Sequence, residues 1–397
     1  MSPSSAPTPV RLLLVDARPL DHPTAGQRGI GRWVRGFLQG LVAIDAPFYA
    51  LYSSDEQAEI LAAEIPDAPV LSWDDVGEHP DLESPGVWYV ATQLMLHPVS
   101  LDPIPSVITT ARLAVAAVMY DVIPYRYPDR YLLDANASAL ARLRAPLART
   151  TDAMLAISVF SADTAAEELD YPRDRIAVIG SGVDSVFGRA STSTDAIPER
   201  FSSLSTVGIV VAVTGSDDRK NTEGLIRAWS MLEPSLRRTR RLVIATGVPA
   251  EIERRWHEVA VDIGVGDEIT ITGSLTDDEM VAILQYGELS VMPSLEEGFG
   301  LPVVEAAACG CPVICSDRSS LPEVLDEPTA TFDPTDPAAM AAAISRALSD
   351  EQHRRVLADA AERAAERWTW PNTARRTLEA LAHLGPRWSM SANQRRD

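Results

Sequence analysis

The sequence predicts an α/β protein with two doubly wound, Rossmann-like domains, each built on a parallel sheet. Two series of short apolar runs support this prediction. One starts at Arg11–Asp16 and the other at Gly208–Val213, and loops and helical segments follow the runs. A chain of 397 residues is long enough for two domains with separate cores. The predicted boundaries are a first domain at 1–190, a linker rich in Ser and Thr at 191–206, and a second domain at 207–370.

The composition is that of an ordinary globular protein, with 46% hydrophobic and 23% charged residues. A net charge of −21 argues against a nucleic-acid partner, because phosphate binding needs clustered Lys and Arg. It leaves open at most a peripheral membrane contact through a local basic face. The first residues do not resemble a signal peptide, and no apolar run approaches the roughly 20 residues of a membrane span. We expect a cytoplasmic protein or one at the inner face of a membrane, and a homodimer is left open.

Three cysteines lie close together near the end of the second domain, at Cys309, Cys311 and Cys315. They could form part of a metal cluster, but the chain has no other cysteine and its six histidines are scattered. Small buried thiols are therefore the favoured interpretation, and an odd count without a disulfide framework indicates a reducing compartment. We expect no resident metal and no cofactor.

A glycine-rich loop follows the first strand and ends in Gly29-Ile30-Gly31-Arg32-Trp33 at the start of a helix. Glycines let a ligand approach the backbone, and the free N–H groups and dipole of a helix start favour an anion. A turn that needs positive φ is the alternative. The spacing differs from G-x-G-x-x-G, which argues against the dinucleotide site of a dehydrogenase.

A second polar position follows the core strand Ala114–Met119, where Tyr120 and Asp121 come next in the chain. Open α/β sheets bind ligands at the carboxyl ends of their strands, so Asp121 is a candidate site residue, with a loop cap as the alternative. The predicted helix Ala135–Arg149 carries three arginines. We interpret it mainly as a solvated face, and a patch for a phosphorylated or lipid-linked acceptor is the alternative. These arginines are Arg142, Arg144 and Arg149.

Adjacent cations follow the first strand of the second domain, at Arg219 and Lys220. Two cations at a strand-to-helix turn suit a diphosphate, because the dipole of the following helix adds to their charge. An ordinary surface pair is the alternative. The neighbouring Asp217-Asp218 pair is not a D-x-D metal motif, and the cations can supply the electrostatic effect of a metal.

The most informative stretch is Pro293–Ile314, which predicts a strand end, a tight glycine loop, a helix, a turn and another strand. Two carboxylates frame the loop, Glu297 before the glycines and Glu305 in the predicted first helical turn. Carboxylates accept pairs of hydrogen bonds from hydroxyl groups, which suits the diols of sugars and ribose.

This stretch, Glu297-Gly298-Phe299-Gly300-Leu301-Pro302-x-x-Glu305, resembles the E-x7-E signature of retaining glycosyltransferases of family 4, the glycosyl transferases group 1. The loop Gly29–Arg32 and the Lys220-Asn221 pair are similar to other motifs of that family, and the resemblance extends from Val15 to about Trp370. It implies the GT-B fold, in which two domains face a central cleft and a final helix, about 371–397, packs back on the first domain. The chain departs from the family pattern at Tyr120, where a histidine that contacts the donor sugar is common.

The resemblance also implies roles for the candidate residues. A nucleotide-sugar donor would bind the second domain, with Glu305 on the ribose, Arg219 and Lys220 on the diphosphate, and Glu297 on the sugar. The implied donor-binding set is Gly29, Gly31, Arg219, Lys220, Glu297, Gly298, Phe299, Gly300, Leu301 and Glu305. The implied catalytic set is Glu297, Asp121, Arg219 and Lys220, and the implied acceptor side is Arg32, Tyr120 and Asp121.

The implied activity is the metal-independent, retaining transfer of a hexose from a GDP- or UDP-hexose, with GDP-mannose as one candidate, in a setting such as polysaccharide biosynthesis. The acceptor would be a glycan, a lipid-linked molecule or a protein. Attack of the acceptor on the leaving-group face is favoured over a covalent intermediate, because the sequence shows no dedicated nucleophile. A relative that binds a sugar nucleotide without catalysis, or serves as a partner subunit, is the alternative raised by Tyr120.

Overall fold

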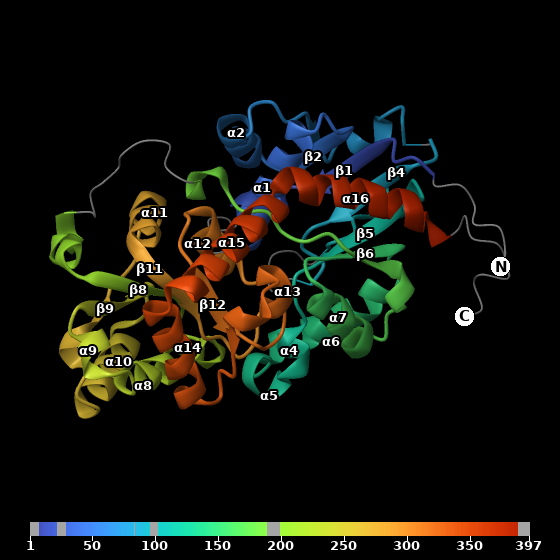
Figure 1. Ribbon diagram of the computed structural model, residues 1–397. Helices are drawn as coiled ribbons and strands as arrows, with labels where there is room; N and C mark the ends of the chain where they lie inside the picture. The colour runs from blue at the N-terminus through green and yellow to red at the C-terminus, as the bar shows by residue number, and fades with distance from the viewer. Residues whose placement is uncertain (1–7, 22–28, 83, 96–101, 189–198, 388–397) are drawn as a thin grey trace, which may run out of the picture. The chain divides into compact units, whose positions relative to one another are not determined.

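The computed structural model describes residues 8–21, 29–82, 84–95, 102–188 and 199–387 (Figure 1). The chain divides into two units. Unit 1 consists of Met1–Gly182 together with Thr369–Asp397, and unit 2 consists of Val183–Trp368. Of the predicted linker, residues 191–198 lie outside the described part, and Glu199–Thr206 forms short 3-10 turns.

Unit 1 contains a seven-stranded parallel sheet with the order β3-β2-β1-β4-β5-β6-β7. Strands β1, β4 and β5 are buried along their whole length, because helices cover both faces of a doubly wound sheet. The strand order reverses between β1 and β4, which is the topological switch point. The strands are β1 (Leu12–Asp16), β2 (Phe48–Tyr52), β3 (Val70–Ser72), β4 (Val87–Ala91), β5 (Ala114–Met119), β6 (Ala153–Ala156) and β7 (Ile176–Val178). The helices are α1 (Ile30–Ala43), α2 (Asp55–Glu64), α3 (Ser106–Thr110), α4 (Ile123–Arg126), α5 (Pro128–Tyr131), α6 (Ala135–Arg149), α7 (Val159–Leu169) and α16 (Trp370–Leu384).

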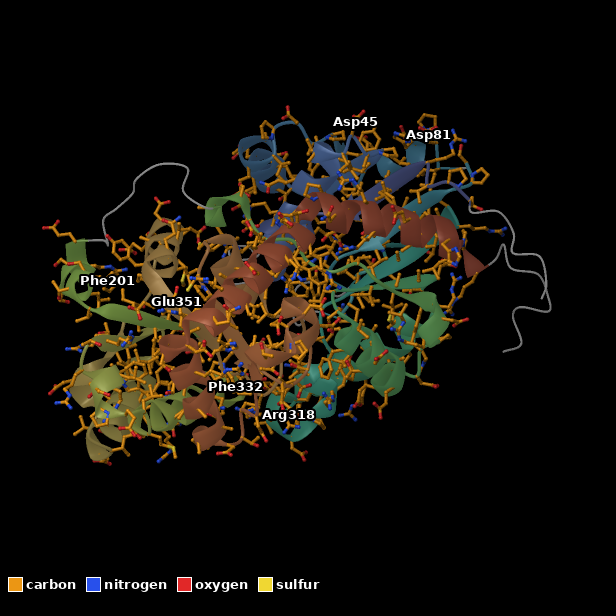
Figure 2. The ribbon with its side chains drawn as sticks, in the orientation of Figure 1. Asp45, Asp81, Phe201, Arg318, Phe332 and Glu351 are labelled. Carbon is orange, nitrogen blue, oxygen red and sulfur yellow. The ribbon has the colours of Figure 1, made fainter. Side chains whose placement is uncertain are left out.

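Unit 2 contains a six-stranded parallel sheet with the order β10-β9-β8-β11-β12-β13, which reverses between β8 and β11. Even the edge strand adds to the core, since Phe332 on β13 is buried (Figure 2). The strands are β8 (Gly208–Val213), β9 (Arg240–Ala245), β10 (Ile269–Ile271), β11 (Gly287–Met292), β12 (Val313–Ser316) and β13 (Thr331–Phe332). The helices are α8 (Thr222–Ser230), α9 (Pro234–Arg237), α10 (Ala250–Asp262), α11 (Asp277–Tyr286), α12 (Leu301–Ala308), α13 (Leu321–Leu325), α14 (Pro337–Ser349) and α15 (Glu351–Arg367). The prediction of two doubly wound parallel-sheet domains is confirmed.

The three cysteines are buried free thiols of unit 2, and burial raises the pKa of each thiol above its ordinary value. In the described ranges, no group of three or more His, Cys, Asp or Glu side chains is arranged to hold a metal ion. Nor does any helix there have the length and hydrophobicity that crossing a membrane requires.

Helix α16 lies beside α1 in unit 1 (Figure 1). Its residue Trp370 fills a space left by three glycines. A Cβ added at Gly36 would lie 1.9 Å from Cε2 of the Trp370 ring, and one at Gly40 or Gly182 would lie 2.4 Å from its backbone. Close approach of α16 to α1 therefore depends on Gly36 and Gly40, and its close approach to the loop after β7 depends on Gly182. Of the predicted final helix, residues 388–397 lie outside the described part.

We expect Gly36→Ala to lower the free energy of unfolding by about 1–3 kcal/mol, because a methyl group overlaps the buried indole ring and overpacking outweighs the better helix propensity of alanine. Thermal unfolding followed by circular dichroism measures this loss. Gly77→Ala is the matched control in the same unit, since its added Cβ would lie 3.5 Å from the nearest atom, an ordinary contact. Equal losses in the two variants would contradict this packing.

Candidate active site

Three loops meet at the carboxyl ends of the unit 2 strands. They follow β8, β11 and β12, and strand order reverses between the first two, where an open α/β sheet leaves a crevice for a ligand. The backbone N–H of Leu295 donates to the carbonyl oxygen of Arg219 at 2.7 Å. The N–H of Glu297 donates to Oγ of Ser319 at 2.9 Å. The Ser320 hydroxyl lies 3.0 and 2.8 Å from the carbonyl oxygens of Glu297 and Phe299. Hydrogen bonds thus join all three loops.

A buried ion cluster is the centre of this site. The Arg219 guanidinium donates from Nη1 to Oε2 of Glu297 at 2.9 Å, and Nζ of Lys220 donates to Oε1 at 2.6 Å. Only 8% of the Glu297 side chain is exposed, against 25% for Arg219 and 18% for Lys220. Burial alone would raise the pKa of the Glu297 carboxyl, but the charges of Lys220 and Arg219 outweigh it and lower the pKa. The carboxylate is therefore ionised at neutral pH.

The cations are held in place by their own loop. Asp217 accepts from the backbone N–H of Arg219 at 3.0 Å and pairs with its Nε at 3.4 Å. The guanidinium also donates to the carbonyl oxygen of Glu296 at 2.9 Å. Asn221 has φ of 55° and donates from Nδ2 to the carbonyl oxygens of Pro293 and Pro334. Such left-handed residues are uncommon outside glycine and persist where surrounding contacts fix them.

The glycine loop ends where α12 begins. Gly300 has φ of 101°, and a Cβ there would lie 2.4 Å from Cδ2 of Leu321, so this position requires glycine. Phe299 is buried with its ring edge-on to Trp368, at 5.1 Å between centroids. Among the described residues, no side chain caps the N-terminus of α12. Glu305 is buried in α12 but is its fifth residue, so the predicted position in the first turn is wrong, because the helix begins one residue before Pro302.

In unit 1 the predicted glycine loop also ends at a helix start. Gly29 precedes α1 with φ of 52°, and no side chain in the described part of the chain caps this helix. A Cβ at Gly29 would meet nothing within 4 Å, so its backbone conformation rather than crowding favours glycine. Gly31 is buried in the first turn of α1, and Arg32 follows it. The earlier part of the loop, residues 22–28, lies outside the described part.

Tyr120 and Asp121 follow β5 and line a cavity of about 240 Å³ whose other walls include α4 and α6. The Asp121 carboxylate accepts from the N–H of Ile123 at 3.1 Å, as a loop cap does. The Tyr120 ring is edge-on to Trp33, and its buried hydroxyl has no hydrogen-bond partner among the residues that the structure describes. Burial raises the pKa of this hydroxyl well above its ordinary value, so it stays protonated.

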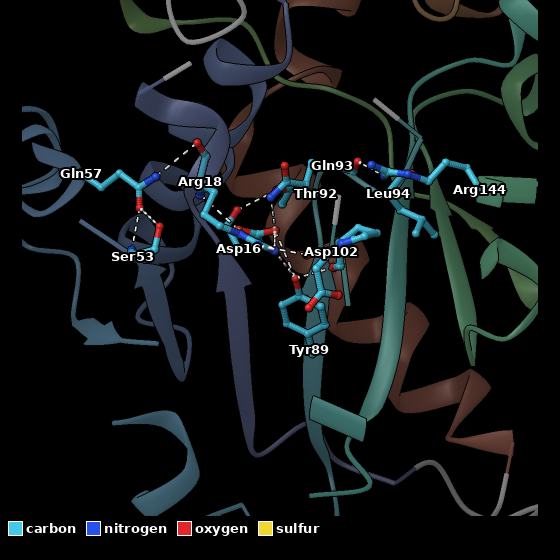
Figure 3. A network of polar contacts seen from close by, with 11 residues as sticks. Asp16, Arg18, Ser53, Gln57, Tyr89, Thr92, Gln93, Leu94, Asp102 and Arg144 are labelled. Carbon is cyan, nitrogen blue, oxygen red and sulfur yellow. Dashed lines mark hydrogen bonds and ion pairs between the residues drawn. The ribbon is translucent and has the colours of Figure 1, made fainter. Parts of the chain in front are cut away.

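The sequence analysis missed a buried polar network at the switch point of unit 1 (Figure 3). Asp16 ends β1 and accepts from Nε and Nη2 of Arg18, each at 2.8 Å, from Nε2 of Gln93 at 2.8 Å and from the Tyr89 hydroxyl at 3.1 Å. Asp121 was predicted as a site residue because it is a carboxylate at the end of a buried strand. The same criterion applies to Asp16, which is the last residue of β1.

The prediction that α6 presents its arginines to solvent is wrong at Arg144. It is buried and donates from Nη1 to the carbonyl oxygens of Gln93 and Leu94 (Figure 3). Arg142 and Arg149 are exposed, as predicted for a solvated face. The prediction is wrong for Arg144 because carbonyl oxygens of the β4 loop compensate its burial.

A second signal in the sequence marks Lys220. It is the only lysine of the chain, and all the other cationic residues among the 35 Lys and Arg are arginines. An ammonium group is a compact point charge with three donors, whereas a guanidinium is a planar fork, so the two are not interchangeable.

Solved structures share this architecture at low sequence identity. The crystal structure of Anabaena Alr3699/HepE in complex with UDP and glucose aligns with a TM-score of 0.70 and 15% identity, over 94% of this chain and 99% of that chain. WaaG, a glycosyltransferase involved in lipopolysaccharide biosynthesis, aligns with a TM-score of 0.61 and 13% identity, over 93% of this chain and 98% of that chain. The fold is therefore of the GT-B class.

Residues 195–364 match the family described as glycosyl transferases group 1, and through them the chain belongs to that family. The serotype-specific mannosyltransferase WbdA of Escherichia coli is 33% identical over 269 residues, which are 67% of this chain and 33% of WbdA. The O-antigen chain mannosyltransferase B of Escherichia coli is 28% identical over 232 residues, 58% of this chain and 60% of that protein. The matched part of the chain thus spans about a third of the length of WbdA.

We expect Glu297→Gln to lower the free energy of unfolding by about 1–3 kcal/mol at neutral pH, because it leaves two partly buried cations without a counter-charge. The folded-state pKa of Glu297 lies below its ordinary 4.5, so the stabilisation is fully present above that pH and is lost as the pH falls through the folded-state pKa. Urea unfolding should therefore show a gap between wild type and variant that narrows below pH 4.5.

Glu288→Gln is the matched control for this variant. Glu288 pairs with Arg240 at 2.8 Å in the same unit, but its side chain is 35% exposed, so its loss should cost no more than about 1 kcal/mol. If Glu297→Gln shows the same small loss as the control, or a gap that is constant down to acid pH, the stabilising role of the ion cluster is contradicted.

Proposed function

We propose that this chain is a retaining hexosyltransferase that transfers mannose from GDP-mannose to a hydroxyl group of a glycan. The observation that carries the proposal is the ion cluster of Glu297, Arg219 and Lys220 at the strand-order reversal of unit 2, inside the segment that matches the family. The donor is inferred from the names of the relatives, two of which are mannosyltransferases. A UDP-hexose is the competing donor, since UDP is bound in the HepE structure.

In this proposal the donor diphosphate binds Arg219 and Lys220. Both cations contact Glu297, but a guanidinium has five N–H donors and an ammonium three, so each can serve the carboxylate and a phosphate oxygen together. The backbone N–H of Leu301, at the start of α12, would offer one further donor toward an anion, since Pro302 has no N–H and the N–H of Val303 donates to the Gly300 carbonyl oxygen. Glu305, on the same helix, would accept from the ribose hydroxyls.

The proposed reaction is a single substitution on the face of the leaving group. The acceptor oxygen bonds to the anomeric carbon, the bond from that carbon to the diphosphate oxygen breaks, and the acceptor proton passes to the departing diphosphate. Arg219 and Lys220 stabilise the negative charge that develops there. Glu297 would accept hydrogen bonds from the sugar. A carboxylate held by two cations is a poor nucleophile, which disfavours a covalent intermediate on Glu297.

The acceptor is assigned to unit 1 in this proposal, on the side of Tyr120 and Asp121. Their cavity has mostly apolar walls, with a carboxylate and a buried hydroxyl among them. Asp121 accepts from the Ile123 N–H, and because each carboxylate oxygen can accept more than one hydrogen bond, it could also accept from an acceptor hydroxyl. Arg32, with Gly29 and Gly31, would lie on the diphosphate and acceptor side of the α1 start.

A panel of nucleotide sugars tests the donor assignment. We expect release of GDP from GDP-mannose when an α-mannoside acceptor is present, and at least about ten-fold slower release from UDP-hexoses, because a few base contacts separate the donors. Nucleotide release followed by chromatography measures both. Binding of the donor without turnover under any acceptor would overturn the enzyme and favour a sugar-nucleotide-binding relative.

We expect Lys220→Ala to reduce transfer by about 10²–10³-fold while the protein stays folded, because it removes a charge that stabilises the departing diphosphate. Lys220→Arg should restore little activity, since a planar fork does not replace a compact ammonium. Initial rates at saturating donor measure the loss. Arg238→Ala removes an exposed cation elsewhere in unit 2 and is the control.

Amine-directed acetylation gives an independent readout of the same site, because Lys220 is the only side-chain amine. GDP should protect the Lys220 peptide from modification, as measured by mass spectrometry. Full activity of Lys220→Ala, together with no protection by GDP, would show that the diphosphate does not bind here.

A further inference from the structure

A second cavity of unit 1 lies at the amino ends of the strands, and we call it the amino-end cavity. Its volume is about 730 Å³, roughly three times that of the Tyr120 cavity. Val87 and Ala114, the first residues of β4 and β5, line it, and so does Asp152, which precedes β6. Tyr120 follows the other end of β5, whose six residues span about 20 Å. The two cavities are therefore separate sites at opposite edges of one sheet.

The walls of the amino-end cavity are part of the hydrophobic core of unit 1. Leu82, Leu113 and Val115 are core residues that are at most 8% exposed, and Ile104 and Leu147 pack against that core. Ligand pockets of proteins are mostly apolar and have volumes of about 300–1,000 Å³. The amino-end cavity therefore has the size and the walls that suit the apolar body of a small molecule.

The polar groups at the cavity wall leave few donors for a sugar or another polyol. The hydroxyls of Thr109 and Thr150 donate to carbonyl oxygens three residues earlier, at 2.9 and 2.7 Å. The Asp152 carboxylate accepts from the backbone N–H groups of Val115 at 2.9 Å and Arg387 at 2.7 Å. Because these groups already serve the fold of unit 1, they offer a ligand only spare acceptor capacity.

Arg112 is the only cation among the described residues that line the amino-end cavity. It is exposed, and its guanidinium has no hydrogen-bond or ion-pair partner within the described part of the chain. The Asp152 carboxylate does not depend on this charge, because Arg175 donates from Nε to the Asp152 carbonyl oxygen at 2.9 Å and brings another cation close to it. A guanidinium binds carboxylates and similar anions through two parallel N–H groups. One available cation beside apolar walls therefore fits a ligand with one negative charge.

The backbone conformation of Arg112 is unusual for an arginine. This residue follows α3 with φ of 54°, in a turn where glycine or asparagine is the usual choice. Six described residues other than glycine have positive φ, and the other five are Asp, Asn or Ser. Short polar side chains tolerate this conformation because they form local hydrogen bonds, which a long guanidinium side chain does not do here. The turn therefore does not explain the arginine, whereas an anionic ligand would.

We propose that the amino-end cavity binds an amphiphilic anion, a small molecule with an apolar body and a single negative charge. The apolar body contacts Leu82, Leu113 and Val115, and the anionic head, a carboxylate or a sulfonate, accepts hydrogen bonds from the Arg112 guanidinium. Binding forms no covalent bond and needs neither donor nor acceptor, so this inference goes beyond the proposed transfer reaction.

Fluorescence titration of the full chain with anilinonaphthalenesulfonate tests the proposal. This dye joins an apolar ring system to one negative charge. We expect an apparent Kd on the order of 10–100 µM, and excess GDP should not change it. Decanoate should displace the dye, and decanol should compete about ten-fold more weakly because it lacks the charge.

Arg112→Asn should weaken dye binding by about ten-fold, because it removes the cation while asparagine suits the left-handed turn. Anilinonaphthalene, the uncharged analogue of the dye, should bind this variant as it binds wild type, which a merely structural role of Arg112 would not produce. Arg142→Gln removes an exposed arginine elsewhere in unit 1 and is the matched control.

Ala111→Trp should abolish binding of both dyes, because Ala111 lines the cavity and an indole ring would fill it. Thr110→Trp is the matched control. Thr110 is the exposed neighbouring residue and is not among the described lining residues, so this variant should bind like wild type. Circular dichroism should show unchanged thermal unfolding in all variants.

Three results would overturn the proposal. The first is no dye binding by folded wild-type protein. The second is displacement of the dye by GDP, because the dye would then occupy the candidate donor site. The third is dye binding that Arg112→Asn and Ala111→Trp change no more than their controls do, because the dye would then bind elsewhere.

Discussion

The carboxylate of Glu297 is buried between Arg219 and Lys220, and these opposite charges hold two loops of unit 2 together. An isolated buried carboxylate costs several kcal/mol, so it is tolerated only where counter-charges and hydrogen bonds surround it. The cations come from the loop after β8 and the carboxylate from the loop after β11, and the strand order brings these two loops together. The left-handed Asn221 and the buried Ser320 then fix the loops to each other.

The fold class could be predicted because its physical cause is local. Strands covered on both faces are almost entirely apolar, and β4, β5, β8 and β1 as far as Val15 are such runs in the sequence. The sheet order and the packing of α16 could not be predicted in the same way. Gly36 and Gly40 leave a space on α1, but the Trp370 side chain that fills it comes from the other end of the chain, and no local pattern connects them.

In the candidate site, too, the sequence did not predict which residues contact one another. The glycine loop, Glu297 and the cations could be found from motifs, but the sequence suggested separate ligands for them and gave no sign that they bind one another. Arg144 resembles its exposed neighbour Arg142 in the sequence, and only the carbonyl oxygens of another loop make it a buried residue. Asp16 could have been found, because it ends a strand as visibly as Asp121 follows one.

Each unit has a buried carboxylate at its switch point, and the two carboxylates differ in their hydrogen-bond and ion-pair partners. In unit 1, Asp16 is matched by the single cation Arg18, and neutral Gln93 and Tyr89 complete its hydrogen bonds, so the network carries no excess charge. In unit 2, buried Glu297 is matched by two cations, and Asp217, with 29% of its side chain exposed, pairs with Arg219 at 3.4 Å, so the two cations and the two carboxylates balance. Asp16 is fully buried, whereas the side chains of Arg219 and Lys220 are 25% and 18% exposed, so the adjacent cations of unit 2 can be reached by a diphosphate. This exposure supports the proposed assignment of the donor to unit 2.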